Sequence, residues 1–529
     1  NASVNDVHNI DVLLGVNTNK EQAFSMYGYG LRGVSDDVYY YNPQKVPPVV
    51  NHGTPEFPEY AATRYYSSDF TEKRMVSYFG RLGYNYKQRY LLEFTFRRDG
   101  SSTFGEGNRW ANFPSVAVGW SFSEEPFIKR LTGGWLNWGK IRGSYGKSGQ
   151  TFTSAYLAHG LMNIMDKSFF GKTGITTDKP VSPYLTWEKT RQYDLGLDMD
   201  MFNYRLNMKL DYYYKYTSSL IYDIPIPGSL YTFGAQVENA MEISNEGLEL
   251  ELQADILRES AVSWRMKFNM ARNWNRFEKS YSGKDVVDGD GTLLVAGRPL
   301  NGLYVWAHRG YYNSDAEVPR LYKIDGQEIY FNGVATNGIS GAVGNYRLLD
   351  LDGDGNPDSY YAGSPLPLAH GGWVNELMWK NFDLNVLVNF TIGRKMINNR
   401  MGLGFSRQSE DGHLTKLFDY RKLRPWDGVN KNPNAPAWGN SLSMNTDSAI
   451  EKVHHLALKQ ITLGYNLPDR ISKKAGLSGV RFFLTAENLF YLSNYSGGNP
   501  EVVNIYTGRD NGDTYPLPRK YTLGLTLNF

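Results

Sequence analysis

Hydrophobic and polar residues alternate with a period of two along much of this chain. In the segment 193–201 every second residue is apolar, and polar residues such as Asp194 lie between them. After the dipeptide 202–203 the alternation continues from Tyr204 to Tyr216. Successive side chains of a β-strand point to opposite faces of its sheet, so the pattern predicts a hairpin with one apolar face and one polar face.

The same alternation recurs as far as the last residue, and it predicts an all-β fold. The predicted antiparallel strands number fifteen: 7–17, 21–30, 74–86, 90–98, 115–124, 135–146, 190–201, 204–217, 243–256, 261–276, 369–379, 381–392, 453–466, 478–490 and 519–529.

Two classes of all-β protein show such alternation. In a soluble sandwich or barrel the apolar face lines a dry core, and the strands are usually about 5–6 residues long. Many strands predicted here run to about 10–14 residues, which suits a tilted strand that crosses a bilayer. We therefore expect a transmembrane antiparallel β-barrel, with its apolar face in outer-membrane lipid and its polar face around a wet interior.

The connections between these strands alternate between short and long. This arrangement is typical of outer-membrane barrels, which have tight periplasmic turns and long extracellular loops. The short turns are predicted near 18–20, 87–89, 202–203, 257–260 and 380–381, with longer ones near 125–134 and 467–477. The long loops are predicted near 31–73, 99–114, 147–189, 218–242, 277–368, 393–452 and 491–518.

The odd number of strands is itself informative. It cannot close a bacterial barrel whose two ends lie on one side of the membrane. An unclosed edge would leave backbone N–H and C=O groups unpaired in lipid. We therefore expect that N-terminal strands of the barrel are absent from this chain. The sequence begins at Asn1 without a Met or a signal peptide, as expected of a processed or truncated chain.

Composition excludes several functional classes. The chain has 529 residues, 15% of them aromatic, and no Cys, which excludes disulfide scaffolds and thiolate metal sites. The formal net charge of +2 gives no indication of nucleic-acid binding. The sequence contains no run of about 18–20 apolar residues, so a helical membrane protein is excluded as well.

Several motifs occur in collinear order between residues 70 and 529. The most distinctive stretch, 97–120, contains Arg97-Arg98-Asp99-Gly100-Ser101-Ser102, Phe104-Gly105, Asn108-Arg109-Trp110, Phe113-Pro114-Ser115 and Gly119-Trp120. Others are Tyr78-Phe79-Gly80-Arg81-Leu82-Gly83-Tyr84, Leu185-Thr186-Trp187-Glu188, Val237-Glu238-Asn239, Asn245-Glu246-Gly247-Leu248-Glu249, Leu463-Gly464-Tyr465-Asn466-Leu467-Pro468 and Ala486-Glu487-Asn488-Leu489-Phe490. Together these motifs resemble the SusC-like, TonB-dependent outer-membrane transporters, and the chain looks like their C-terminal barrel portion.

This resemblance implies a plugged barrel of about 22 strands, of which residues 1–529 are a partial barrel domain without the plug and the first strands. It also implies a TonB energy-coupling complex that acts through the plug, and a SusD-like surface lipoprotein above the extracellular loops. The implied activity is import of oligosaccharides, with oligopeptides as the alternative. A passive porin assembled from two chains and a soluble or surface-attached glycan-binding β-protein stay open as other classes.

One acidic stretch is a candidate metal site. Oxygen-bearing side chains at alternate positions around glycines resemble the first half of a calcium loop, although Tyr361 stands where such a loop has its last Glu. Two interpretations stay open: a site for Ca²⁺ or Mg²⁺, and an acidic turn that only keeps the loop soluble. The candidate ligands are Asp350, Asp352, Asp354, Asn356 and Asp358.

Aromatic residues give two further candidate roles. The chain ends on Phe529, and the resemblance implies that this terminal aromatic residue is part of the signal for barrel insertion, beside a role in the interfacial aromatic girdle. Four aromatic residues of the long loops are candidates for contact with the cargo or the lipoprotein lid, and simple loop packing is the alternative: Tyr231, Trp306, Trp426 and Trp438.

Catalysis is not predicted, and the sequence offers no cofactor-binding or catalytic residues. The adjacent pair His454 and His455 would point to opposite faces of a strand, so it forms a poor paired site. The glycines Gly28 and Gly30 lack the strand-to-helix context that a phosphate-binding loop requires.

Overall fold

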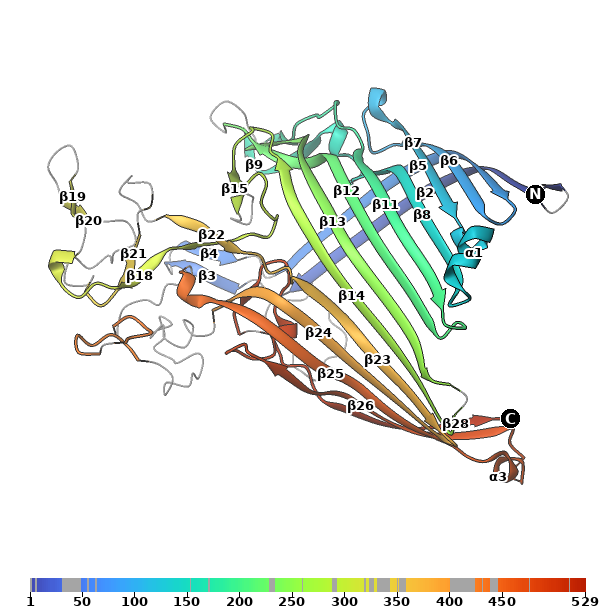
Figure 1. Cartoon of the computed structure of the whole chain (residues 1–529). Helices are drawn as coiled ribbons and strands as arrows, with labels where there is room; N and C mark the ends of the chain where they lie inside the picture. The colour runs from blue at the N-terminus through green and yellow to red at the C-terminus, as the bar shows by residue number, and fades with distance from the viewer. Residues whose placement is uncertain are drawn as a thin grey trace.

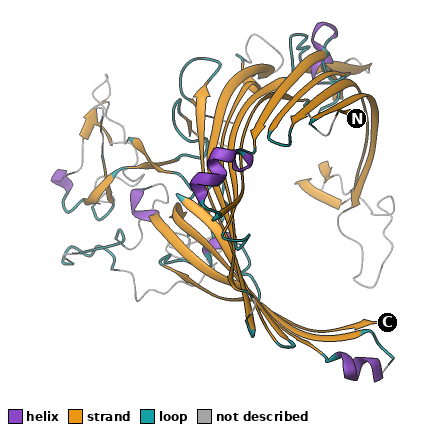
Figure 2. Ribbon diagram, turned by 45° about the vertical axis from the view of Figure 1, so that its right-hand side comes forward, coloured by secondary structure: helices purple, strands orange, loops and turns teal. Residues whose placement is uncertain are grey.

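Most of the chain forms one large, curved antiparallel sheet (Figures 1 and 2). The computed structural model describes residues 2–4, 7–30, 49–54, 57–61, 64–152, 154–169, 172–227, 234–258, 260–287, 293–317, 320–322, 328–330, 343–349, 351, 358–399, 424–430, 432–437, 446–474, 476–512 and 514–529. The sheet has 16 strands, and its neighbours along the wall follow chain order from β1 to β28. This is the wall of a β-barrel, as the alternation predicts.

The wall strands are long, and each pairs with the next one in the sheet. In order they are β1 (Ala2–Val4), β2 (His8–Gly30), β5 (Arg64–Tyr86), β6 (Tyr90–Ser101), β7 (Trp110–Trp120), β8 (Leu136–Gln150), β11 (Glu188–Met201), β12 (Leu206–Pro225), β13 (Ala235–Leu257), β14 (Val262–Lys279), β23 (Ala369–Trp379), β24 (Phe382–Asn398), β25 (Ile450–Asn466), β26 (Gly479–Ser493) and β28 (Lys520–Asn528). The two-residue strand β27 (Arg509–Asp510) pairs with β24 off this path.

The remaining elements lie in the connections. They form six two-stranded sheets, which pair β3 (Val49–Thr54) with β4 (Phe57–Ala61), β9 (Leu161–Phe169) with β10 (Lys172–Lys179), β15 (Val286–Val287) with β16 (Leu293–Leu294), β17 (Leu303–Trp306) with β22 (Ser359–Gly363), β18 (His308–Tyr311) with β21 (Tyr346–Leu348) and β19 (Arg320–Tyr322) with β20 (Glu328–Tyr330). Short helices are α1 (Pro126–Thr132) and α3 (Asp469–Lys474), and single 3-10 turns are η2 (Glu106–Asn108), η3 (Phe122–Glu124), η4 (Leu157–His159), η5 (Asp315–Glu317), η8 (Asp447–Ala449) and η9 (Pro500–Val502). Within the described residues, the helices are all too short or too polar to span a bilayer.

The first two predicted strands are wrong in one respect. The segments 7–17 and 21–30 are not separated by a turn, because β2 runs unbroken from His8 to Gly30 along β5. The polar residues at 18–20 belong to this strand, and Lys20 lies opposite Arg74. Both of these cations bind the carboxylate of Glu72, at 3.2 and 2.6 Å. The polar residues at 18–20 resemble a turn in the sequence, but Lys20 among them takes part in an ion cluster across two strands.

Several strands extend further than predicted at the end that carries the long loops. Strand β12 reaches Pro225 and β13 begins at Ala235, and the two stay paired there. Between them lies a register shift at Thr217 and Leu220. The period-two pattern fades at this point because a strand that has left the hydrocarbon no longer needs one apolar face, although its backbone pairing continues.

The register places the apolar residues of neighbouring strands in common rows on one face. Leu197 lies opposite Leu210, which lies opposite Leu250, which lies opposite Met270. Further along the wall, on the same face, neighbouring strands also pair apolar residues, such as Leu384 with Leu463. Many of these side chains are exposed, among them Leu195, Leu463, Leu484 and Leu523, with exposed fractions of 57%, 46%, 48% and 80%. This face is the lipid-facing outer surface.

The short turns lie together at the end of the wall that carries α1 and α3 (Figure 1). The turn after β5 places Lys87 and Gln88 at φ values of 52° and 56°, and the turn after β11 has Phe202 and Asn203 at 55° and 57°. Such left-handed residues match the twist of the flanking strands in a tight hairpin. The predicted separation of short turns and long loops to opposite ends is confirmed.

The two end strands of the described sheet lie apart (Figure 2). In the part of the chain that the structure describes, β1 and β28 each have one neighbour and are not paired with each other. The expectation that further strands complete the wall stays a prediction.

The assignment of the outer face can be tested with one substitution placed on either side of β24. Val386 lies in an apolar row opposite Ile461, and its neighbour Asn385 points to the other face opposite Thr462. Val386→Arg should destabilise the folded barrel by about 2–4 kcal/mol, because it places a cation in hydrocarbon. Asn385→Arg should cost under about 1 kcal/mol. Urea unfolding of the complete protein in lipid vesicles measures both, and equal effects would contradict the assignment.

Candidate functional site

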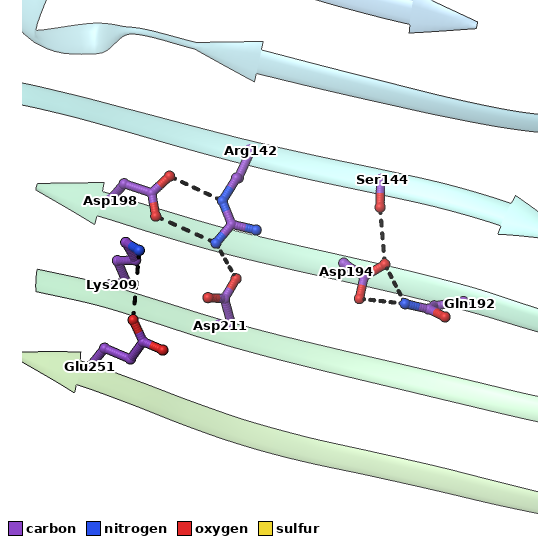
Figure 3. Close-up of polar contacts among 8 residues, drawn as sticks. All are labelled: Arg142, Ser144, Gln192, Asp194, Asp198, Lys209, Asp211 and Glu251. Carbon is purple, nitrogen blue, oxygen red and sulfur yellow. Dashed lines mark hydrogen bonds and ion pairs between the residues drawn. The ribbon is translucent and has the colours of Figure 1, made fainter. Parts of the chain in front are cut away.

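The concave face of the wall carries a ladder of ion pairs (Figure 3). The guanidinium of Arg142 on β8 binds Asp198 on β11, with 3.0 Å between Nε and Oδ2, and its Nη2 lies 2.5 Å from Asp211 Oδ1 on β12. To reach Asp211 it crosses Gly196, where a Cβ would lie 2.4 Å from the guanidinium carbon. Glycine at 196 therefore lets one arginine join three strands.

Hydroxyl and amide groups continue this ladder toward the long loops. Ser144 Oγ donates to Asp194 at 3.0 Å, and Gln192 Nε2 donates to the two oxygens of the same carboxylate at 2.9 and 3.0 Å (Figure 3). A hollow of about 690 Å³ lies against Ser144 and Asp194 and extends across to β2. The predicted polar interior thus includes groups that hydrogen-bond both within one strand and across strands.

Charges on the second half of the wall are paired in the same manner. Each pair joins neighbouring or next-neighbouring strands, so an acid on one strand compensates a base on another. The pairs are Lys209 with Glu251 at 3.6 Å, Arg265 with Asp255 at 2.7 Å, Lys267 with Glu376 at 2.7 Å, and Arg481 with Asp383 at 2.5 Å. Since these side chains are partly solvated, each pair contributes at most about 1 kcal/mol to stability. Their main effect is that these eight charges compensate one another between strands.

The last long loop folds back against the concave face instead of standing above it. Arg394 at the end of β24 is 7% exposed and holds the loop by its backbone. Its Nη1 donates to the carbonyl of Pro500 at 3.1 Å, and its Nη2 donates to those of Val503 and Asn504 at 2.9 Å each. The loop then pairs with β24 through β27, in parallel. We call residues 494–512 the inward loop.

An acidic side chain of the inward loop also binds the wall. Glu501 lies 3.5 Å from His455 Nε2 and 3.1 Å from Lys459 Nζ, both on β25. The contact with His455, and then that with Lys459, lowers the pKa of Glu501 to about 2, although burial acts in the opposite direction. The inward loop is thus fixed by one cation beneath its carbonyls and by one carboxylate of its own.

Between the inward loop and the wall lies the larger hollow of the concave face, about 1180 Å³. Its lining comes from β12, β13, β14, β23, β24, β25 and the inward loop, and includes Lys209, Glu251, Asn269, His370, Asn389 and Glu501. This volume exceeds that of many small-molecule sites, which measure about 300–1,000 Å³. It is the candidate ligand path through this part of the barrel.

A buried cluster with aromatic residues at its centre joins two loops at the extracellular end of the wall. Phe104 and Trp187 are 0% and 2% exposed, with 4.9 Å between their ring centroids. Trp187 Nε1 donates to the carbonyl of Arg109 at 3.2 Å. These residues come from loops far apart in sequence, so the cluster joins the loop around 99–114 to the loop around 147–189. The full cluster is Phe104, Ala111, Phe113, Phe152, Leu157, Ala158, Leu185, Trp187 and Val237.

An asparagine links this cluster to the next loop. Asn239 on β13 accepts from the Thr186 amide at 2.8 Å and donates to the Thr186 and Ser219 carbonyls at 2.9 and 2.7 Å. Glu188 accepts from the amide of Ile221 at 2.9 Å. The Leu-Thr-Trp-Glu and Val-Glu-Asn motifs of the sequence therefore hold the rim together, which explains their residue types by packing and hydrogen bonding.

The two longest loops, 277–368 and 393–452, pack against each other beyond the wall. Trp426 Nε1 donates to Asn313 Oδ1 at 3.0 Å, and the amide of Ala437 donates to the Gly344 carbonyl at 2.8 Å. Closer to the wall, Asp447 accepts from the Tyr360 hydroxyl at 3.1 Å and also contacts His308. Burial raises the pKa of Tyr346, which packs in the same region. We call this pair of loops the docked loops.

Two of the four candidate aromatic residues lie in the described part of the chain, and two do not. Trp306 and Trp426 both lie in the docked loops, half-buried, with Trp306 bridged to Thr446. Tyr231 and Trp438 lie outside the described residues. Contact of any of them with cargo or a lid stays a prediction.

The acidic stretch can be followed only at its end. Asp358 lies opposite Leu349, whose carbonyl accepts from the Asp358 amide at 2.9 Å, and its carboxylate accepts from the amide of Leu351. Asp350, Asp352, Asp354 and Asn356 lie outside the described residues. Among the residues that are described, His, Asp and Glu side chains do not gather in threes that could hold a metal ion. The Ca²⁺ or Mg²⁺ site stays a prediction.

At the C-terminus, Phe529 is 93% exposed beyond the last residue of β28. Its carbonyl accepts from the Ser478 hydroxyl at 3.2 Å, which fixes the chain end beside β26. The exposed ring is thus available to the membrane interface or to another protein, and its role in barrel insertion stays a prediction.

The sequence analysis did not predict that Arg394, Glu501 and His455 together attach the inward loop to the wall. The prediction that His454 and His455 face opposite ways agrees with the structure, in which the His455 side chain contacts Glu501 and His454 binds Asn494 through its amide. The pattern that located the strands carries no information on a loop that folds inward. The only local signal of this contact was the position of Arg394, directly after the apolar row of β24.

The attachment of the inward loop should depend on the ionised form of Glu501. A lowered pKa means that this contribution is complete above the ordinary value of 4.5 and is lost as the pH falls towards about 2. Glu501→Gln should remove it at neutral pH, so amide hydrogen exchange across 496–508 should become about tenfold faster. Glu124→Gln, which breaks the 2.7 Å pair with Lys129 at the opposite end, is the matched control. Unchanged exchange in Glu501→Gln would contradict this account.

Comparison with known proteins places this architecture in a family. The chain matches the family described as "TonB dependent receptor-like, beta-barrel" over residues 3–360. It is 32% identical to the TonB-dependent receptor P26 of Formosa agariphila over 491 residues, which cover 88% of this chain and 47% of that protein. It is 30% identical to the TonB-dependent receptor SusC of Bacteroides thetaiotaomicron over 494 residues, which cover 89% of this chain and 45% of that protein.

A similar solved structure is that of the RagAB peptide transporter. The TM-score is 0.78 at 22% sequence identity, and the match covers 100% of this chain and 54% of that chain. This likeness shows a shared fold. The chain spans about half the length of the curated relatives that it matches. It belongs to the TonB-dependent receptor-like β-barrel family, of the SusC type, and is a protein of the bacterial outer membrane.

Proposed function

We propose that this chain forms part of the wall of a TonB-dependent importer that takes up oligosaccharides together with a SusD-like surface lipoprotein. The observation that carries the proposal is the chemistry of the concave face. Its acids and bases bind one another, as Arg142 does with Asp198 and Asp211 and as Lys267 does with Glu376. The larger hollow that would meet a cargo also presents amide side chains such as Asn269 and Asn389, beside the carboxylate of Glu249.

Such a surface suits a neutral cargo that offers many hydroxyl groups. A cargo with free charges would have to compete with ion pairs already formed across the strands. Asn269 and Asn389 face the larger hollow and can hydrogen-bond to sugar hydroxyls. An oligopeptide with its termini and side-chain charges fits this wall less well, and it is the alternative cargo.

The inward loop supports a transporter over a passive porin. A loop held by Arg394 and Glu501 narrows the passage on the side of β24 and β25. Cargo that passes must therefore contact specific groups instead of crossing an open channel. In the proposed importer, a plug outside this chain blocks the rest of the passage, and the TonB complex supplies the energy to move it.

The docked loops support a partner at the extracellular end. They project from the wall as a connected structure (Figure 1), fixed by contacts such as Trp426 with Asn313. A connected platform offers a lipoprotein lid a defined surface with little ordering cost on binding. Trp306 and Trp426 are the proposed contacts, and the acidic loop 350–358 with its Ca²⁺ or Mg²⁺ would stiffen the same platform.

The cargo assignment can be tested with neighbouring substitutions on β24. Asn389→Leu removes a hydrogen-bonding group from the hollow and should reduce the uptake of oligosaccharides about fivefold, the factor for one lost hydrogen bond. Val388→Leu, on the lipid face, should leave uptake unchanged. Both are measured as uptake of labelled oligosaccharides by cells that carry the complete protein, with and without a proton motive force.

Other outcomes of the same assay separate the alternatives. Uptake of labelled oligopeptides in place of oligosaccharides would contradict the proposed cargo and support a peptide importer. Uptake that continues after the proton motive force is collapsed, together with a large steady conductance in planar bilayers, would contradict the importer and support a porin.

A further inference from the structure

Three cationic side chains gather on the outer face of two neighbouring wall strands. Arg191 on β11 lies directly opposite Lys147 on β8 in the strand register. Lys189 lies two positions further along β11 and so shares the same face. All three side chains are exposed. We call Lys147, Lys189 and Arg191 the outer cation cluster.

The side of the wall that they occupy follows from the alternation. Arg191 is in period with Tyr193 and Leu195, which belong to the apolar outer rows. The residues between them, Gln192 and Asp194, point to the concave face and bind each other there (Figure 3). The outer cation cluster therefore faces away from the interior, outside the proposed cargo path.

The arrangement is unfavourable in the protein alone. Like charges directly opposite each other on adjacent strands repel and destabilise the sheet. Lys209 on β12, by contrast, lies opposite a compensating charge, Glu251 on β13. Among the described residues, the side chains of the outer cation cluster have no ion pair or hydrogen bond, and Glu242, the acid two strands away, is bound by Tyr216. The cluster therefore lacks a counter-charge in the described part of the protein.

The position of the outer cation cluster relative to the membrane supplies a counter-charge. Immediately below it lie Tyr145, Tyr193 and Tyr214, with ring centroids 4.8 and 6.4 Å apart in succession. Below these rings the face is apolar, with Leu195 57% exposed. Tyrosines on the outer face of a barrel mark the membrane interface. The cluster thus lies at the level of the lipid headgroups, at the extracellular end of the strands.

We propose that the outer cation cluster binds the phosphate group of a phosphorylated lipid of the outer leaflet. An arginine fork and two ammonium groups match the charge and the oxygen geometry of a phosphate. The tyrosine row and the apolar row below would lie along the acyl chains of the same molecule. A free phosphate ion would use only the cations, so the continuous apolar surface favours a lipid as the source.

The test measures lipid retained by the complete protein after extraction into detergent. The probe is a phosphorylated lipid A-type glycolipid, quantified by native mass spectrometry over a titration. Since each cation near an anionic surface contributes about a fivefold factor, Lys147→Gln with Arg191→Gln should weaken binding about 30-fold. Lys473→Gln with Lys474→Gln, the same charge change on α3 at the opposite end, should leave binding unchanged.

Two further arms identify the bound group. The same glycolipid without its phosphates should bind as weakly to the natural protein as the phosphorylated one does to the double variant. Inorganic phosphate at millimolar concentration should fail to displace the phosphorylated lipid. Equal binding by the Lys147→Gln, Arg191→Gln variant, equal binding of the dephosphorylated lipid, or displacement by free phosphate would each overturn the proposal. Hydrogen exchange in β8 and β11 confirms that the variant keeps its fold.

Discussion

Backbone pairing inside hydrocarbon is the constraint on which this structure depends. A strand in lipid must satisfy all of its N–H and C=O groups with its neighbours, and so the register of each pair is fixed along its whole length. Once the register is fixed, every second side chain of each strand meets the same face. The row that passes through Leu197, Leu210, Leu250 and Met270 is the direct result. The side chains that lie between these apolar residues all point to the concave face, and there they form the ion pairs.

The loops obey a different constraint, because water can satisfy their backbone. They are held by a few buried side chains that join segments distant in sequence: Trp187 at one part of the rim, Asn239 beside it, and Arg394 under the inward loop. Each of these residues binds backbone carbonyls or amides of another loop. The extracellular end is thus organised by side-chain contacts with the backbone of other segments.

The sequence predicts the wall well because the period-two pattern is imposed by lipid. It predicts β23 at 369–379, the bounds that the structure has. It is wrong at 18–20, where Lys20, Glu72 and Arg74 satisfy one another outside the hydrocarbon and the pattern resembles a turn. The inward loop could not be predicted, because the pairing of Glu501 with His455 and Lys459 joins segments that no local pattern relates. The motifs that indicate the family were found, but their role in the rim is visible only in three dimensions.

The central claim is that alternate residues of one strand contact lipid and water. The chain has no Cys, so a single cysteine introduced in turn from 207 to 212 on β12 is the only thiol among these 529 residues and can carry a spin label. The most direct measurement is the collision rate of each label with oxygen, which concentrates in lipid, and with a nickel chelate, which stays in water. The account predicts that oxygen dominates at 208, 210 and 212 and the chelate at 207, 209 and 211. Labels shielded from both at the even positions would mean a dry core there, and would contradict it.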